Sequence, residues 1–148
     1  NESITREEAV KILICAFYPE ADTVEIPFSD VDNSAWYADF IKKAYGKGIA
    51  KGISASEFGV GDSITRQDLI TLAYRAFLAK GYITETTDLT SLDTFGDKDS
   101  ISDYAKTSMA SMVKAGIIQG SNGNVNPKGF ATRAEVAVMC ARLVELMK

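Results

Sequence analysis

The segment Ile4-Thr5-Arg6-Glu7-Glu8-Ala9 recurs twice, as Ile64-Thr65-Arg66-Gln67-Asp68-Leu69 and, with alanine in the first place, as Ala131-Thr132-Arg133-Ala134-Glu135-Val136. The repeated arginines are 60 and 67 residues apart (66 − 6 and 133 − 66). These spacings are too long for a tight solenoid unit and suit a small module used three times. We therefore expect a single domain over residues 1–148, with a half repeat at 1–20, a second repeat at 28–80 and a third at 95–148.

Each copy of the segment contains the signals that begin a helix. A threonine followed three residues later by an acid forms a capping box, in which the hydroxyl and the carboxylate each accept a backbone N–H. Apolar residues then recur at helical spacing, which predicts three amphipathic helices whose apolar stripes face one another in a central bundle. The stripes are Ala9, Ile12, Leu13 and Ala16; Leu69, Leu72, Ala73, Ala76 and Phe77; and Val136, Met139, Cys140 and Leu143. Gly81, which follows Lys80, is expected to end the second of these helices in a left-handed conformation.

A second pattern repeats between these helices. Phe28-Ser29-Asp30-Val31-Asp32 is matched by Phe95-Gly96-Asp97-Lys98-Asp99, and in both an aromatic residue, Trp36 or Tyr104, precedes another amphipathic stretch. The segments Gly48-Ile49-Ala50-Lys51-Gly52 and Gly116-Ile117-Ile118-Gln119-Gly120 follow, and their glycines permit turns that residues with a Cβ resist. The loops after them are predicted to be exposed but ordered, each pinned to the body by one hydrophobic residue, Phe58 or Val125. The fold class expected is therefore mainly helical, all-α.

Composition limits the possible partners. With 148 residues, 46% of them hydrophobic, the chain can bury a substantial core, and it has no apolar run long enough to span a membrane. A net charge of −4 with an isoelectric point near 4.9 argues against nucleic acid and anionic membranes as partners, because both are bound by basic surfaces.

The chain has two cysteines and no histidine. Cys15 and Cys140 lie on the apolar faces of the first and third capped helices, where a disulfide is geometrically conceivable, but two buried thiols are the favoured interpretation. Zinc is improbable without Cys-x-x-Cys or histidine. The Asp-x-Asp pairs invite calcium, yet the EF-hand positions that require glycine and glutamate are occupied by other residues, so no metal and no cofactor are expected.

Taken in order, Phe-x-Asp, an aromatic residue, Gly-Ile-x-x-Gly and Ile-Thr-Arg with an acid resemble the S-layer homology repeat, the surface-anchoring module of bacterial envelope proteins. The resemblance covers a half repeat at residues 4–18 and repeats at about 28–78 and 95–146. It implies pseudo-threefold symmetry, with the capped helices in a central bundle and loop-lined grooves between neighbouring repeats. It also implies noncovalent binding of a secondary cell-wall polysaccharide, often one carrying pyruvate ketals.

The resemblance also implies which residues bind the ligand. The family's binding arginine corresponds to Arg6, Arg66 and Arg133, its loop aspartate to Asp30 and Asp97, its groove aromatic to Trp36, and its close-approach glycines to Gly52 and Gly120. A guanidinium at a helix N-terminus suits a ketal carboxylate because it offers forked donors and the positive end of the helix dipole.

Each of these residues also has a structural interpretation. The arginines are either ligand contacts or internal partners of acids, and Arg66 is a candidate to pair with Asp62 or Asp68. Trp36 is expected to lie partly in the core, and Asp30 and Asp97 are expected to cap the helices that they precede.

Tyr104 in place of tryptophan, Ala131 in place of isoleucine, and Ser54-Ala55-Ser56-Glu57 in place of an Asp-Gly turn depart from the family pattern. The three grooves are therefore not expected to be equivalent. The first half of the first repeat either lies upstream or is degenerate.

Three function classes follow. The leading hypothesis is a secreted carbohydrate-binding module of the bacterial cell envelope, a monomeric domain that anchors a larger surface protein to the cell wall or S-layer. The alternative is a structural S-layer scaffold or protein-interaction module without sugar affinity. An enzyme is not expected. Without histidine, glycoside hydrolysis by paired carboxylates would be the only catalytic mechanism available, and nothing beyond the presence of acidic residues supports that mechanism.

Overall fold

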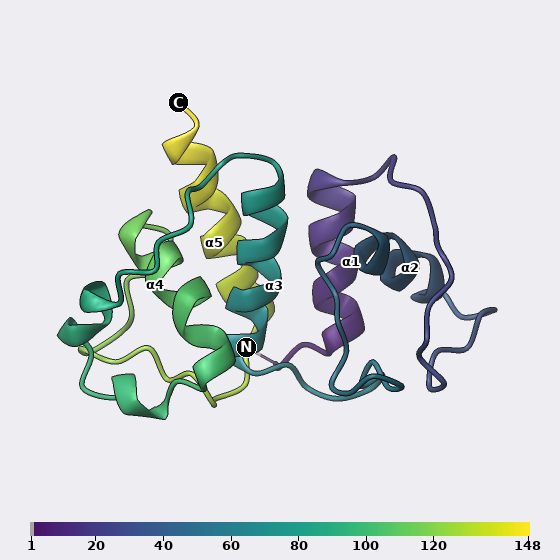
Figure 1. Cartoon of the computed structure of the whole chain (residues 1–148), viewed down its shortest axis with the longest axis horizontal. Coiled ribbons are helices and arrows are strands. Elements are labelled where there is room, and N and C mark those ends of the chain that lie inside the picture. Colours follow the sequence, from purple (N-terminus) through teal and green to yellow (C-terminus); the bar gives the residue numbers. More distant parts are fainter. Residues whose placement is uncertain (1) are drawn as a thin grey trace.

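The computed structural model describes residues 2–148 and is built from helices (Figure 1). The α-helices are α1 (Arg6–Phe17), α2 (Ala38–Gly46), α3 (Arg66–Ala79), α4 (Lys106–Lys114) and α5 (Arg133–Leu146). Three short 3₁₀ helices lie between α3 and α4: η1 (Thr90–Thr94), η2 (Lys98–Ser100) and η3 (Asp103–Ala105). Isolated bridges are the only β pairing within residues 2–148, so the prediction of an all-α fold is confirmed.

Each short helix packs on the long helix that precedes it. α2 packs against α1, α4 packs against α3, and α1 and α3 pack against each other (Figure 1). The side chains that make these contacts include Ile41 and Ala44 on α2 and Met109 and Met112 on α4, all of them fully buried. Counted from Trp36 and Tyr104, Ile41 corresponds to Met109 and Ala44 to Met112, so the repeated apolar residues form the repeated packing.

The predicted apolar stripe is buried on α3, buried except for the partly buried Cys140 on α5, and only in part buried on α1. All five predicted residues of α3 are buried, as are Val136, Met139 and Leu143 of α5. On α1 the buried residues include Val10 and Ile14, whereas Ile12 is only partly buried and Ala16 is exposed. The buried face is rotated because α1 contacts α2 on one side and α3 on the other.

α5 is the least covered of the long helices. It packs less closely against the other helices than α1 and α3 do against each other. Three of its large apolar residues, Val138, Val144 and Leu146, are 44% to 54% exposed, as is its C-cap residue Met147. Within residues 2–148, no helix combines the length and the apolarity that crossing a membrane requires.

Loops and turns follow the glycine pattern of the sequence. Gly81 has φ of +75° and follows the C-cap residue Lys80, which confirms the predicted end of α3. Phe58 is fully buried and Val125 is 5% exposed, so each of the two long loops is pinned to the body as expected.

The two cysteines are free. Cys15 is exposed and Cys140 is partly buried, so the prediction of two buried thiols is wrong for Cys15. The error has the same cause as that of the α1 stripe, because the buried face of α1 runs through Val10 and Ile14 and leaves Cys15 toward solvent. Burial raises the pKa of the Cys140 thiol.

Candidate functional site

The N-termini of α1, α3 and α5 are joined by a closed cycle of backbone hydrogen bonds. The N–H of Ile4 donates to the carbonyl of Ala131 (3.1 Å), that of Ala131 to the carbonyl of Ile64 (2.9 Å), and that of Ile64 to the carbonyl of Ile4 (3.0 Å). All three residues are at most 1% exposed. This arrangement has approximate threefold symmetry, and it brings the three Thr-Arg pairs to one end of the molecule.

The repeated arginines form a second cycle around the same axis. Arg6 pairs with Asp68 (3.1 Å), Arg66 pairs with Glu135 (2.7 Å), and Arg133 pairs with Glu8. Each acid is the third residue of the next capped helix rather than of the arginine's own helix.

The partner predicted for Arg66, Asp62 or Asp68, is therefore wrong. Because the three segments contact one another in a cycle, each arginine lies beside the acid of the next capped helix. Sequence reasoning considered only acids close to Arg66 in the chain.

The three helix caps are not identical. Thr5 and Glu8 form the complete capping box, but Thr65 and Thr132 only accept the N–H of Asp68 and Glu135. The backbone N–H of Thr5 and, to a lesser extent, the charge of Arg133 hold the pKa of Glu8 below its ordinary value. Glu8 thus accepts both the N–H of Thr5 and a donor of Arg133, whereas the carboxylates of Asp68 and Glu135 bind an arginine without the bond to the N-cap N–H.

The three guanidinium groups differ in accessibility. The side chains of Arg6, Arg66 and Arg133 are 9%, 27% and 63% exposed, respectively. Arg6 is the most enclosed because its Nε also donates to the Phe58 carbonyl (2.9 Å) and its guanidinium lies over the Phe58 ring. Its donors are directed to protein acceptors.

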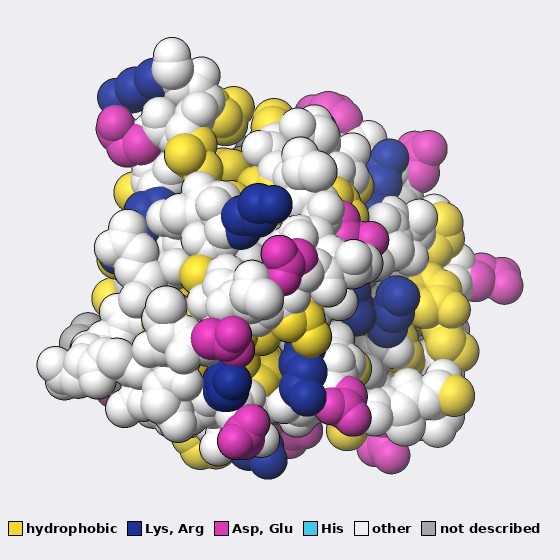
Figure 2. All heavy atoms as spheres, turned by 60° about the vertical axis from the view of Figure 1, so that its left-hand side comes forward, with side chains coloured by type: hydrophobic (Ala, Val, Ile, Leu, Met, Phe, Trp, Pro, Cys, Tyr) yellow, Lys and Arg dark blue, Asp and Glu magenta, His cyan; other side chains and the backbone are white. Residues whose placement is uncertain are grey.

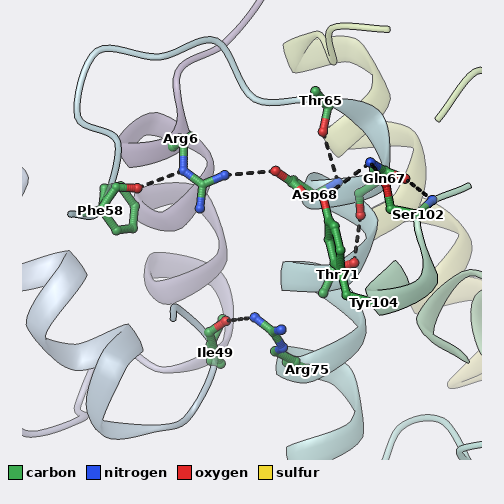
Figure 3. A network of polar contacts seen from close by, with 10 residues as sticks. All are labelled: Arg6, Ile49, Phe58, Thr65, Gln67, Asp68, Thr71, Arg75, Ser102 and Tyr104. Carbon is green, nitrogen blue, oxygen red and sulfur yellow. Dashed lines mark hydrogen bonds and ion pairs between the residues drawn. The ribbon is translucent and has the colours of Figure 1, made fainter. Parts of the chain in front are cut away.

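A polar network surrounds Asp68, the acid that pairs with Arg6 (Figure 3). The Tyr104 hydroxyl donates to the carboxylate of Asp68 at 2.5 Å, and Gln67 joins Tyr104 and Ser102 to the start of α3. Burial and the bond to Asp68 raise the pKa of Tyr104 to about 12. The tyrosine that departs from the family pattern thus gives the carboxylate of the Arg6–Asp68 pair a further donor, although its own side chain is 61% exposed.

A cleft of about 820 Å³ lies between the start of α3, α5 and the loop after α4, and we call it the Arg66 cleft. Three residues predicted to bind ligand, Arg66, Asp97 and Gly120, line it together with Glu135 and Arg142. The cleft therefore combines cationic, acidic and apolar surface next to the N-terminus of a helix.

Asp30 and Asp97 organise loops rather than cap helices. Asp30 accepts the N–H groups of Phe58, Gly59 and Val60 at 2.8 to 3.0 Å, and Asp97 accepts those of Val125 and Asn126 at 3.0 and 2.7 Å. Burial disfavours the charge of Asp30, but the three N–H donors outweigh it and lower its pKa. The predicted capping role is wrong because these carboxylates are directed to loops 28 residues away.

Gly52 and Gly120 are required by their own turns. Both have left-handed φ angles, +82° and +75°. A Cβ on Gly52 would lie 2.5 Å from the Phe28 ring, and one on Gly120 would lie 2.7 Å from the Phe95 ring. The close approach predicted at these glycines is thus made, within the protein, by the phenylalanine of the Phe-x-Asp pattern.

Trp36 is 54% exposed, so the prediction that it lies partly in the core is wrong. It precedes α2, which packs on α1, and its ring lies 5.3 Å from the Nζ atom of Lys11 on that helix. Trp36 does not line the Arg66 cleft.

Sequence reasoning missed Arg75 and Arg142. Each guanidinium donates to the carbonyl of the isoleucine in the Gly-Ile segment, Ile49 at 3.0 Å and Ile117 at 2.9 Å. Each also lies nine residues after a repeated arginine (75 − 66 and 142 − 133), and this constant offset could have identified them. Cys15 occupies the same offset after Arg6.

The charged groups do not form a field of one sign. Basic and acidic side chains alternate over the face drawn in Figure 2, with apolar side chains between them. Recognition of an anion would therefore depend on individual arginines and lysines rather than on a broad basic surface.

Comparison with known proteins matches residues 27–70 and 94–137 to the S-layer homology domain. Over 147 residues the chain is 38% identical to the exoglucanase XynX of Acetivibrio thermocellus and 37% identical to an amylopullulanase of Thermoanaerobacterium thermosulfurigenes. It is 33% identical over 148 residues to the surface-layer 125 kDa protein of Lysinibacillus sphaericus.

These alignments cover 97% to 98% of the chain but only 8% to 13% of the relatives' own length. The similarity is therefore to one segment of much longer proteins. Because the domain match spans more than half of the chain and agrees with the helical fold, the chain belongs to the S-layer homology domain family.

Proposed function

We propose that the chain consists of three copies of one module that close into a single domain, with the first copy represented by its second half. The boundaries are 1–20, 28–80 and 95–148. Support comes from the two cycles, one of backbone hydrogen bonds and one of arginine–acid pairs, in which α1, α3 and α5 play equivalent parts.

S-layer homology domains are non-catalytic anchoring modules of secreted bacterial surface proteins, and this chain is such a cell-wall-associated module. The enzyme names belong to relatives of which the matched segment is a small part. The proposal is that the chain acts as a monomeric anchoring domain for a larger surface protein.

The proposed ligand is a secondary cell-wall polysaccharide that carries a carboxylate, as a pyruvate ketal does. The Arg66 cleft is the observation that carries this proposal, because it is large enough for a sugar and contains a partly exposed guanidinium at a helix N-terminus. Glu135 engages Arg66 through Nη2, so other N–H donors of the guanidinium remain to bind a ligand carboxylate. The N–H groups of Arg66, Gln67 and Asp68 are bonded to Gly129, Pro127 and Thr65, so the start of α3 contributes the positive end of its dipole rather than free donors.

Co-sedimentation with purified cell walls tests this function. The wild-type chain is expected to sediment with intact walls and to stay in solution with walls from which the secondary polysaccharide has been stripped. Arg66→Gln should reduce sedimentation, and Lys114→Gln, which removes an exposed charge on α4, should not. Equal retention on stripped walls would contradict polysaccharide binding. Self-association without any wall polymer would instead favour a scaffold role.

A further inference from the structure

Gly129 lies directly against the guanidinium of Arg66. A Cβ on Gly129 would overlap the Nη1 atom of Arg66 and would lie 2.6 Å from the Nδ2 atom of Asn126, closer than a Cβ approaches other groups in proteins. The absence of a side chain at Gly129 therefore leaves the space that the guanidinium occupies. Arg66 and Asn126 line the Arg66 cleft, whereas Gly129 does not, so an effect of the glycine on a ligand would pass through these two side chains.

The backbone beneath this contact is fixed by hydrogen bonds. The N–H of Arg66 donates to the carbonyl of Gly129 at 2.8 Å, and the N–H of Gly129 donates to the carbonyl of Asn126 at 3.2 Å. Gly129 does not have a left-handed φ angle, so its backbone conformation suits alanine as well. The atoms that a methyl group would meet are the ends of two flexible side chains. A methyl group would thus displace the guanidinium and leave the turn in place.

The equivalent position beside Arg6 carries a side chain. Asp62 occupies this position, because the N–H of Arg6 donates to the carbonyl of Asp62 at 3.0 Å, as that of Arg66 does to Gly129. A Cβ on Gly59 would lie 3.1 Å from the Oδ2 atom of Asp62 and 3.0 Å from the Cδ atom of Arg6. The Asp62 side chain therefore lies beside the stem of Arg6, where the second copy has only a glycine.

The presence of this side chain coincides with a different direction of the arginine. Beside Asp62, the guanidinium of Arg6 lies over the Phe58 ring, and its Nε donates to the Phe58 carbonyl. Beside Gly129, the guanidinium of Arg66 lines the cleft. The two copies thus differ at one position that touches the arginine and in where the guanidinium lies.

We infer that Gly129 is a positioning residue for ligand binding: its missing side chain makes room for the Arg66 guanidinium, which keeps the remaining donors of Arg66 directed at a carboxylate in the cleft. This inference rests on the proposed function and deepens it. Glu135 pairs with Nη2, and Gly129 admits Nη1, so the two residues fix both ends of the guanidinium fork. Recognition of a carboxylate depends on this orientation, because the donors of a guanidinium are held in one plane.

A double-mutant cycle tests this role. Calorimetric titration with purified pyruvylated wall polysaccharide compares the wild type, Gly129→Ala, Arg66→Gln and the double variant. We expect Gly129→Ala to weaken binding by about tenfold, the equivalent of one charge-assisted hydrogen bond, and to keep a urea midpoint close to that of the wild type. In the Arg66→Gln background the same change should have no further effect on affinity, because no guanidinium remains to be displaced. Gly46→Ala is the matched control on α2, where a Cβ meets only the Val24 side chain, and should bind as the wild type does.

A spectroscopic measurement tests the position of the guanidinium without a ligand. The Nε–H signal of Arg66 in a nitrogen–proton correlation spectrum can be identified by its loss in Arg66→Gln. This signal should shift in Gly129→Ala and stay in place in Gly46→Ala, because only the first change adds a methyl group against the guanidinium.

The outcomes separate the positioning role from the function. An unchanged Arg66 signal in Gly129→Ala, or an equal loss of affinity on adding Gly129→Ala to Arg66→Gln, would overturn the role of Gly129 and leave the proposed function standing. A fall in the urea midpoint without a shift of the Arg66 signal would assign the glycine to the fold alone. Failure of the wild type to bind the polysaccharide would overturn the proposed function, and with it the part of Gly129 in binding, even where the Arg66 signal shifts.

Discussion

Arg6, Arg66 and Arg133 occupy the same place in three copies of one segment, yet their surroundings give them different physical roles. Arg6 is almost wholly enclosed and joins Phe58 to Asp68. Arg133 is mostly exposed and joins one acid. An enclosed guanidinium supports the fold, because removing it leaves buried acceptors without donors. An exposed one is available to a ligand and contributes little to stability.

Alanine substitutions should therefore separate these roles. Arg6→Ala is expected to lower the free energy of unfolding by about 1 to 3 kcal/mol, because the Phe58 carbonyl loses the Arg6 donor and Asp68 loses its cationic partner. Arg133→Ala should change it by less than about 1 kcal/mol. Urea denaturation of both variants measures the difference, and equal losses of stability would contradict the assignment.

The carboxylate of Asp30 makes the stability of the fold depend on pH. Its folded pKa lies below the ordinary value of 3.8, so its contribution to stability is complete above that value and is lost as the pH falls through the lowered pKa. Wild type should exceed Asp30→Asn in stability at about pH 7, and the difference should shrink below about pH 4. Unfolding both proteins in urea across this range provides the measurement. A difference that stays constant into acid would show that the carboxylate charge is not what holds the loop.

At the scale of elements, helix starts and turns were predictable because their signals are local. The threonine caps, the glycine turns and the apolar spacing each depend on residues within a few positions of one another. The errors concern partners distant in the chain. Asp30 bonds a loop 28 residues away, and the buried face of α1 depends on contacts with both α2 and α3.

Two glycines of the same segment allow the cost of a left-handed backbone conformation to be compared with the cost of steric crowding. Gly116 and Gly120 both have left-handed φ angles, but a Cβ on Gly116 meets nothing within 4 Å, whereas one on Gly120 meets Asn124 and Phe95 at 2.7 Å. Gly116→Ala should cost about 1 kcal/mol, and Gly120→Ala should cost more because the turn and the Phe95 ring must shift. Thermal or urea unfolding of the two variants tests this order, and equal costs would show that the turn yields without strain.

The burial of the long helices predicts unequal sensitivity to truncation. Leu72 on α3 is 3% exposed, and its replacement by alanine should cost about 2 to 5 kcal/mol. Val144 on α5 is 51% exposed, and Val144→Ala should stay within about 0.5 kcal/mol. Full stability of the Leu72 variant in chemical denaturation would contradict the packing of α3 at the centre of the molecule.

At the scale of the whole molecule, the internal repeat indicated the all-α fold, but not which copy of the site is open. That difference arises because Arg6 is enclosed by contacts with both Phe58 and Asp68, whereas Arg66 and Arg133 each pair with one acid and are more exposed. Each arginine pairs with the acid of the next helix. This exchange of partners between copies could not be predicted either, because no local sequence pattern indicates it. Both properties become apparent only once the three helix N-termini meet.

The central claim is that this domain holds a wall polysaccharide by a carboxylate that guanidinium groups recognise. Calorimetric titration of the chain with purified pyruvylated wall polysaccharide, and with the same polymer after mild removal of the ketals, tests it most directly. We predict saturable binding to the first polymer and an affinity at least about tenfold lower for the second, corresponding to roughly 1.4 kcal/mol. Equal affinity for both polymers would contradict carboxylate recognition.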